Sequence, residues 1–230
     1  MWLGVSSRPI DRKPFSSPFI KCTCIGLAGF IRNSWEDLSP DRSFWAVLRL
    51  FVACEFVEPS VIEGLTRFQE KVLGGFGGIK LVEPNNMHFT LAFLGDQKEE
   101  NLSLITGALG KVRFPAAQIG LRGTGAFPSL RNPRVIFVSA AKGADWLSGL
   151  ASQVRENLGK EGVWYDRTPF SPHITLARVK RTEPGLYREL TPHMDDDFGS
   201  ILLDTVRLKK SSLTPAGPVY ESLFEVHAQV

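Results

Sequence analysis

Two segments of the chain share the pattern His-x-Thr-Leu, one beginning at His88 and the other at His173. Imidazole has an unperturbed pKa of about 6.5, so near neutral pH one histidine can accept a proton while another donates one. Thr90 and Thr175 can donate hydrogen bonds to phosphoryl oxygens, where negative charge accumulates during the reaction. Two such pairs in one cleft would suit cleavage of a phosphodiester, especially a cyclic one, and this chemistry requires no metal and no cofactor.

A single His-x-Thr motif carries little weight, because threonine is common in strands and most histidines are not catalytic. Here two of only four histidines carry the same pattern. His193 precedes Met194 and three aspartates, which admits a hard-metal site and a metal hydrolase as an alternative. A solvated acidic loop is the simpler interpretation of that segment. His227 is expected at the surface, at the end of a strand.

Each motif is expected on a strand, where side chains alternate between two faces. His88, Thr90 and Ala92 would then share one face, opposite Phe89, Leu91 and Phe93. The second motif has the same pattern, with His173, Thr175 and Ala177 opposite Ile174 and Leu176. Each strand would therefore bury an apolar face and turn a His-Thr pair outward.

The elements around the motifs follow a repeated order. In the first half, apolar periodicity predicts strands over 47–56, 79–82, 87–94 and 114–121, with helices over 59–73 and 98–112. In the second half it predicts strands over 134–140, 163–165, 173–179, 201–209 and 219–226, with helices over 144–158 and from Pro184. Both halves begin strand, helix, strand, strand, helix, strand, with the motif on the third strand.

This repetition predicts an α+β fold with a pseudo-twofold internal duplication. Two lobes of largely antiparallel sheet, flanked by helices, would enclose a central cleft. If the halves are related by a pseudo-twofold axis, both His-Thr pairs can face that cleft.

Residues 1–45 contain four prolines and no periodic apolar pattern, which indicates a poorly ordered extension before a domain over residues 46–230. A second hypothesis is that translation begins near Val47, and intact-mass measurement of the native protein tests it. The composition is that of an ordinary globular protein with a net charge of +3. Three sparse cysteines favour a reducing cytoplasm, and no apolar run reaches the length of a membrane span.

The paired motifs resemble those of the two-histidine (2H) phosphoesterase superfamily, and within it the RNA 2′,3′-cyclic phosphodiesterase family, also called the 2′-5′ RNA ligase family. The resemblance covers the chain from about Leu48 onward. Further matching segments are Arg49–Ala53, Gly125–Pro128, Leu208–Ser211 and Pro218–Glu221.

The resemblance implies opening of a 2′,3′-cyclic phosphate at an RNA end to leave a 2′-phosphate. It implies that His88 is the general acid, His173 the general base, and Thr90 and Thr175 the phosphate-binding hydroxyls. It also matches Arg178 to a phosphate contact and Phe93 to a residue near the nucleobase. Strict alternation would bury both of these residues, so they reach the cleft only if the strand ends, twists or bulges there. A core position is the alternative for Phe93.

Arg131 and Arg134 are further candidates, as cations that guide an RNA backbone. Two other functions stay open: action on another cyclic phosphate, such as ADP-ribose 1″,2″-cyclic phosphate, and a non-catalytic RNA-binding module. The reverse ligation is chemically allowed because the same groups serve both directions. A monomer is expected.

Overall fold

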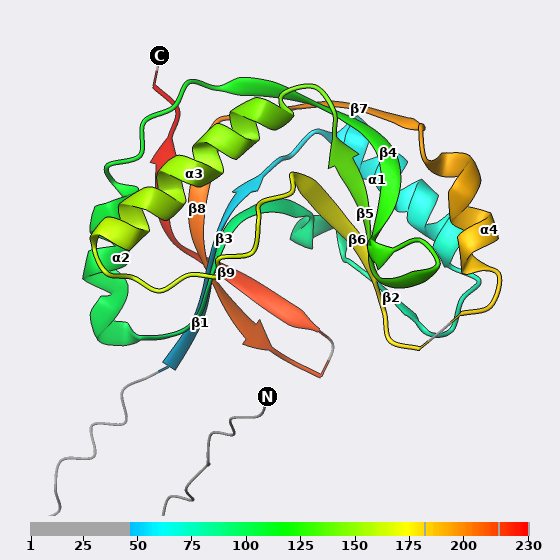
Figure 1. Ribbon diagram of the computed structural model, residues 1–230, viewed down its shortest axis with the longest axis horizontal. Helices are drawn as coiled ribbons and strands as arrows, with labels where there is room; N and C mark the ends of the chain where they lie inside the picture. The colour runs from blue at the N-terminus through cyan, green and yellow to red at the C-terminus, as the bar shows by residue number, and fades with distance from the viewer. Residues whose placement is uncertain (1–46, 182, 216, 230) are drawn as a thin grey trace, which may run out of the picture. The chain divides into compact units, whose positions relative to one another are not determined.

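The computed structural model describes residues 47–181, 183–215 and 217–229 (Figure 1). The extension predicted for residues 1–45 lies outside these residues. Within the described part of the chain, no helix is long and apolar enough to cross a lipid bilayer.

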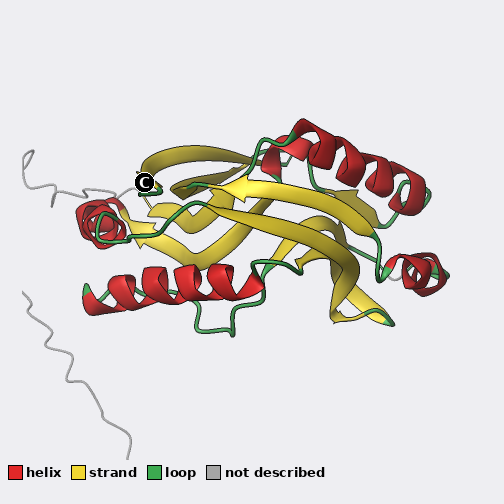
Figure 2. Cartoon of the chain, turned by 90° about the horizontal axis from the view of Figure 1, so that it is seen from above, coloured by secondary structure: helices red, strands yellow, loops and turns green. Residues whose placement is uncertain are grey.

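A nine-stranded sheet forms the centre of this part of the chain, and every pairing between its strands is antiparallel. Its order is β7-β4-β5-β6-β3-β1-β8-β9, with β2 paired to β6. The strands are β1 (Val47–Glu55), β2 (Ile79–Leu81), β3 (His88–Lys98), β4 (Ala117–Ser129), β5 (Asn132–Ala140), β6 (His173–Val179), β7 (Asp197–Leu203), β8 (Thr205–Leu213) and β9 (Pro218–His227). The sheet curls between helices that lie on its outer sides (Figure 2). The predicted α+β class with antiparallel strands is confirmed.

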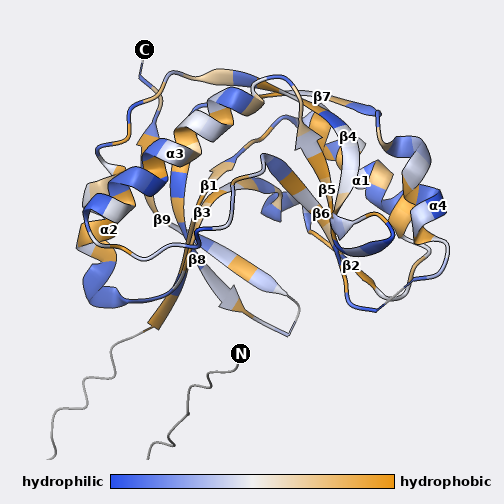
Figure 3. Cartoon of the chain, in the orientation of Figure 1, coloured by the Kyte–Doolittle hydropathy of each residue, from blue (hydrophilic) through white to orange (hydrophobic). Residues whose placement is uncertain are grey.

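The helices that flank the sheet in the described residues are α1 (Pro59–Phe68), α2 (Leu102–Leu109), α3 (Ala144–Lys160) and α4 (Leu186–Leu190). Proline opens α1, where its missing N–H costs no helical hydrogen bond. The predicted apolar face of α3 is confirmed, since Leu147, Leu150, Val154 and Leu158 are buried. In Figure 3 this helix changes repeatedly between hydrophobic and hydrophilic colour along its length, as an amphipathic helix does.

The two halves of the sequence are interleaved in space. Strand β1 from the first half pairs with β8 from the second, and β4 from the first half pairs with β5 from the second. The helices cross over in the same way, because α1 packs on β7 and α3 packs on β3. Each side of the sheet therefore contains elements from both halves, and β3 and β6 meet in the middle.

Several predicted boundaries are wrong. The single strand predicted over 201–209 is two strands, β7 and β8, separated at Asp204. The alternation of buried residues continues through this break, at Ile201, Leu203 and Thr205, so periodicity could not reveal it. Residues 163–165 form no strand, although Val163 and Tyr165 are buried there. The second predicted helix is limited to Leu102–Leu109, and α3 continues past Gly159 to Lys160.

Candidate active site

The two motifs lie on adjacent strands at the centre of the sheet. Strands β3 and β6 run antiparallel, and Phe89 pairs with Ile174. This pairing brings the two histidines to one cleft of about 890 Å³. Six residues singled out from the sequence line it: His88, Thr90, Phe93, His173, Thr175 and Arg178.

A β-bulge in each motif strand explains how Phe93 and Arg178 reach the cleft. On β1, Ala53 pairs with Thr90 but Val52 pairs with Ala92, so the register shifts by one residue at Leu91. On β5, Phe137 pairs with Thr175 and Ile136 with Ala177, so the same shift occurs at the equivalent place. A bulge moves the following residues to the other face of the strand.

The burial of these side chains agrees with the two bulges. Ala92 and Ala177 are fully buried, so their predicted place on the histidine face is wrong. Phe93 is 50% exposed and lines the cleft, so the alternative of a core position is wrong. Arg178 is exposed and also lines the cleft. Side chains on these two strands therefore alternate strictly between the faces only from each histidine to its threonine.

His88 is held by its own strand and by aromatic neighbours. Its Nδ1 lies 2.7 Å from the carbonyl oxygen of Asn86, and its Nε2 lies 3.1 Å from the Thr90 hydroxyl. The rings of Phe51 and Tyr220 lie 5.1 Å and 5.5 Å from the imidazole. A carbonyl only accepts hydrogen bonds, so Nδ1 carries the proton in the neutral ring and Nε2 faces the threonine as an acceptor.

His173 repeats this arrangement. Its Nδ1 lies 2.7 Å from the carbonyl oxygen of Ser171, which again is the residue two positions earlier. The rings of Phe127 and Phe137 lie 5.0 Å and 5.1 Å from the imidazole. The neutral form of each histidine therefore keeps its Nε2 for the cleft. These aromatic neighbours were not predicted as part of the site, because single apolar residues on other strands give no signal of their contact with a histidine.

Burial lowers the pKa of both histidines. For His88 it lowers the pKa to about 4, against the opposing effects of the hydrogen bond to Asn86 and the Glu55 carboxylate. For His173 burial also lowers the pKa, and the hydrogen bond to Ser171 opposes it. The charge of Arg178 lowers both pKa values. Both imidazoles are therefore neutral in the unliganded cleft at pH 7.

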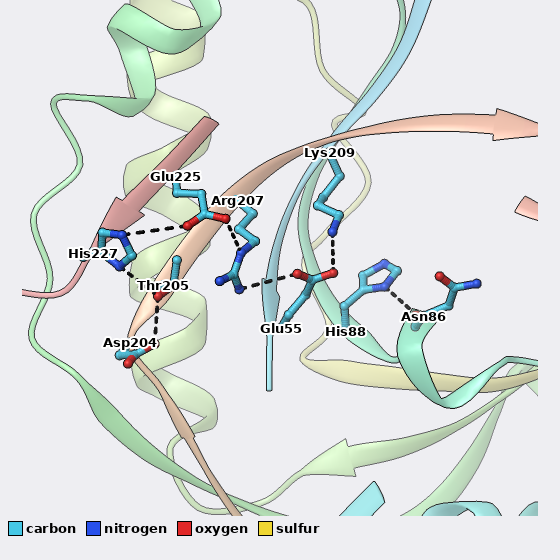
Figure 4. Close-up of polar contacts among 9 residues, drawn as sticks. All are labelled: Glu55, Asn86, His88, Asp204, Thr205, Arg207, Lys209, Glu225 and His227. Carbon is cyan, nitrogen blue, oxygen red and sulfur yellow. Dashed lines mark hydrogen bonds and ion pairs between the residues drawn. The ribbon is translucent and has the colours of Figure 1, made fainter. Parts of the chain in front are cut away.

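A chain of ion pairs lies beside His88 (Figure 4). Among the described residues, Arg178 is the only charged side chain that shifts the pKa of His173. Glu55 is the cross-strand partner of His88 and accepts a hydrogen bond of 2.6 Å from Lys209. Arg207 lies 3.4 Å from the other Glu55 oxygen and donates to Glu225 at 2.8 Å. Lys209 is only 6% exposed, so its charge is compensated mainly by Glu55. This network makes the two histidines electrostatically different.

The cleft also carries positive charge suited to an anionic ligand. Arg49, Lys80 and Arg178 line it, together with the carboxylate of Glu83. Lys80 on β2 is the cross-strand partner of Arg178 on β6, so two of these cations come from neighbouring strands. Cations around two neutral imidazoles favour binding of a phosphodiester.

Two predicted substrate contacts are not brought to the cleft. Arg131 and Arg134 are exposed at the β4–β5 hairpin, and the guanidinium of Arg131 lies 5.3 Å from the centre of the Tyr187 ring. His193 also lies apart: its Nδ1 bonds to Asp196 at 2.6 Å, and its ring packs on Phe68. Among the described residues, no three histidine, cysteine or acidic side chains gather as a metal site would require.

Comparison with known proteins agrees with this arrangement. The family model described as "LigT like Phosphoesterase" matches the chain twice, over residues 56–137 and 138–220. An RNA 2′,3′-cyclic phosphodiesterase of Archaeoglobus fulgidus is 39% identical over 76% of this chain and 98% of its own length. A second relative with that name, from Thermus thermophilus, is 40% identical over 76% of this chain and 88% of its own length.

Solved structures share the fold. TT0787 of Thermus thermophilus has a TM-score of 0.64 at 36% identity, covering 78% of this chain and 97% of its own. LigT of E. coli complexed with 3′-AMP has a TM-score of 0.67 at 25% identity, covering 80% of this chain and 100% of its own. The double match of one family model accounts for the two halves as a duplication. The chain belongs to the LigT-like phosphoesterase family.

Proposed function

We propose that this protein hydrolyses 2′,3′-cyclic phosphate ends of RNA to 2′-phosphomonoesters, by acid–base catalysis between two histidines without a metal. The observation that carries the proposal is the convergence of His88 and His173 in one cleft, each with Nδ1 bonded to a backbone carbonyl. The names of the relatives support the choice of substrate.

In this proposal His173 is the base and His88 the acid. Neutral His173 accepts a proton from water as the water oxygen bonds to phosphorus. The bond from phosphorus to the 3′ oxygen breaks, and that oxygen takes the proton of His88. The phosphate stays on the 2′ oxygen. Because both histidines are neutral in the unliganded cleft, the acid must gain its proton as the anionic substrate binds.

The charges around His88 act on its pKa in opposite directions. The Glu55 carboxylate beside it favours the imidazolium form, whereas no carboxylate among the described residues acts on His173. A bound phosphodiester would add a second negative charge near both rings. Burial nevertheless lowers the pKa of His88 to about 4, so the charges alone do not select it as the acid, and the assignment of that role follows the resemblance of its motif to the family.

The remaining residues bind and orient the substrate in this proposal. Thr90 and Thr175 donate hydrogen bonds to the non-bridging oxygens, and Arg178 compensates their charge. Phe93 contacts the terminal nucleobase with its exposed ring. Contacts of Arg131 and Arg134 with an RNA backbone beyond the cleft stay predictions, as do reverse ligation, a monomeric state and a cytoplasmic location.

The decisive experiment is hydrolysis of an oligonucleotide with a 2′,3′-cyclic phosphate in the presence of EDTA. We expect a 2′-phosphate product, and a rate loss of roughly 10²–10⁴-fold or more for His88→Ala and for His173→Ala. His193→Ala is the matched control, because that histidine lies outside the cleft. Activity that survives both cleft substitutions, or that EDTA abolishes and a metal restores, would refute the proposal.

A further inference from the structure

An exposed tryptophan stands at the rim of the cleft, on the segment between α3 and β6. Trp164 is 62% exposed, whereas its neighbours Val163 and Tyr165 are buried. These two buried neighbours fix the backbone against the core and turn the indole outward. The ring is therefore presented at a defined place and does not belong to the core.

Hydrogen bonds dock this segment onto the strand that carries the first motif. The N–H of Asp166 donates to the carbonyl of Phe93 at 2.9 Å. The side-chain amide of Gln97 donates to the carbonyl of Trp164 at 3.4 Å and to that of Leu94 at 2.6 Å. Gln97 is itself buried. The position of Trp164 is thus coupled to the same stretch of β3 that carries Phe93.

The indole packs on a glycine that lines the cleft. A β-carbon at Gly95 would lie 3.2 Å from Cζ3 of Trp164 and 3.9 Å from its Cε3. Gly95 has a φ of 63° and is a cleft residue. Only glycine combines this backbone conformation with so close a ring. Trp164 therefore borders the cleft at the end where Phe93 and Arg49 line it.

Phe93 and Gly95 are two residues apart on β3, on either side of a second register shift at Leu94. The exposed rings of Phe93 and Trp164 thus follow one another along the cleft rim, with Arg49 on the neighbouring strand, where Leu50 pairs with Gly95. Two aromatic rings beside a cation are what a single-stranded nucleic acid needs to place successive bases and the phosphate between them.

We propose that Trp164 is the stacking platform for the nucleobase that precedes the nucleotide carrying the cyclic phosphate. The proposal rests on the proposed function, because it takes the terminal base to lie at Phe93. It implies a preference for oligonucleotide ends over mononucleotides, with little dependence on the identity of the second base, since every base presents a π-face.

The test compares kcat/KM for adenosine 2′,3′-cyclic phosphate with that for an adenine dinucleotide ending in the same group. A third substrate is the dinucleotide with an abasic first nucleotide. The enzymes are the wild type, Trp164→Ala and Trp164→Phe, with Leu104→Ala as a control. Leu104 is an exposed apolar residue on α2 that does not line the cleft.

We expect Trp164→Ala to reduce the ratio of dinucleotide to mononucleotide kcat/KM roughly 5- to 150-fold, the value of one base–aromatic stack. Trp164→Phe should retain most of the ratio, and Leu104→Ala all of it. For the wild type, kcat/KM for the abasic dinucleotide should be lower than that for the intact dinucleotide by the same factor. With the abasic substrate, Trp164→Ala should not lower kcat/KM further.

An unchanged ratio in Trp164→Ala would overturn the proposal. An equal loss of kcat/KM for the mononucleotide and for the intact dinucleotide would also overturn it, because that result would indicate a distorted cleft. If the wild type hydrolyses neither substrate, the proposed function itself fails, and this subsite fails with it.

Discussion

The ammonium group of Lys209 lies 2.6 Å from a carboxylate oxygen of Glu55, directly beside His88. The pair places one negative and one positive charge next to an imidazole that is itself half-buried. Glu55 raises the pKa of His88, and Lys209 lowers it, so the two partners act on the ring in opposite directions. Neither residue lines the cleft.

Substitution of each partner should therefore shift the His88 titration in opposite directions. Glu55→Gln removes the negative charge and leaves Lys209, so the pKa of His88 should fall further below its ordinary value. Lys209→Met leaves Glu55 paired with Arg207, so the pKa of His88 should rise. NMR titration of the imidazole, with its signals assigned by their loss in His88→Ala, measures both shifts.

The control is Lys160→Met, which removes the cation of an exposed pair with Glu156 on α3. This substitution should leave the pKa of His88 unchanged. Shifts of the same sign in Glu55→Gln and Lys209→Met would indicate a common structural disturbance and would contradict the electrostatic account of the pair.

The pH dependence of the reaction should show lowered histidine pKa values. The active form needs one proton on the histidine pair, and a histidine with a lowered pKa loses its proton at a lower pH. The alkaline limb of kcat/KM, which reports the free enzyme, should therefore lie below pH 6.5. These limbs belong to the coupled pair and not to one residue.

The limb of kcat should lie at higher pH than that of kcat/KM, because a bound phosphodiester anion favours the imidazolium form. Steady-state profiles from acidic to mildly alkaline pH provide both limbs. This prediction would be contradicted if the alkaline limb of kcat/KM lay well above the ordinary histidine pKa of about 6.5. It would also be contradicted if the limbs of kcat and kcat/KM lay at the same pH.

The two threonine hydroxyls should matter for the transition state more than for substrate binding. Thr90→Val and Thr175→Val keep the shape of the side chain but remove the donor, so each should lower kcat by roughly 10²–10³-fold. Thr90→Ser and Thr175→Ser retain a hydroxyl and should recover much of that loss. Single-turnover rates with saturating enzyme separate this effect from binding, and a valine variant impaired only in KM would argue against it.

Both the catalytic candidates and the α+β class could be predicted from the sequence because they depend on short-range periodicity. The His-Thr spacing follows from strand alternation, and it survives in the structure as far as Thr90 and Thr175. The bulges after them could not be predicted, because an extra residue at Leu91 or Leu176 changes the face of Phe93 or Arg178 without changing the apolar pattern.

The long-range pairing of strands could not be predicted from the sequence either. The break at Asp204 separates strands that join opposite sides of the sheet, β7 to β4 and β8 to β1. The Glu55–Lys209 pair depends on that topology, since its residues are 154 positions apart. No local pattern distinguishes this buried lysine from the more exposed Lys210 that follows it.

A side chain at Gly95 should destabilise the fold and displace the Trp164 ring, and a single substitution tests both effects. Gly95→Ala places a β-carbon on a backbone with a φ of 63°, which costs about 1–2 kcal/mol of folding free energy. The same carbon would lie 3.2 Å from the Trp164 ring and push it from its place. We therefore expect a lower free energy of unfolding in urea and a reduced preference for the dinucleotide substrate.

Gly75→Ala is the matched control for this substitution, because a β-carbon there meets nothing within 4 Å and the φ is not positive. Gly75→Ala should change the free energy of unfolding only slightly and should leave the substrate preference unchanged. If Gly95→Ala were as stable and as selective as Gly75→Ala, the indole would not depend on this glycine, and Trp164 would reach its position in another way.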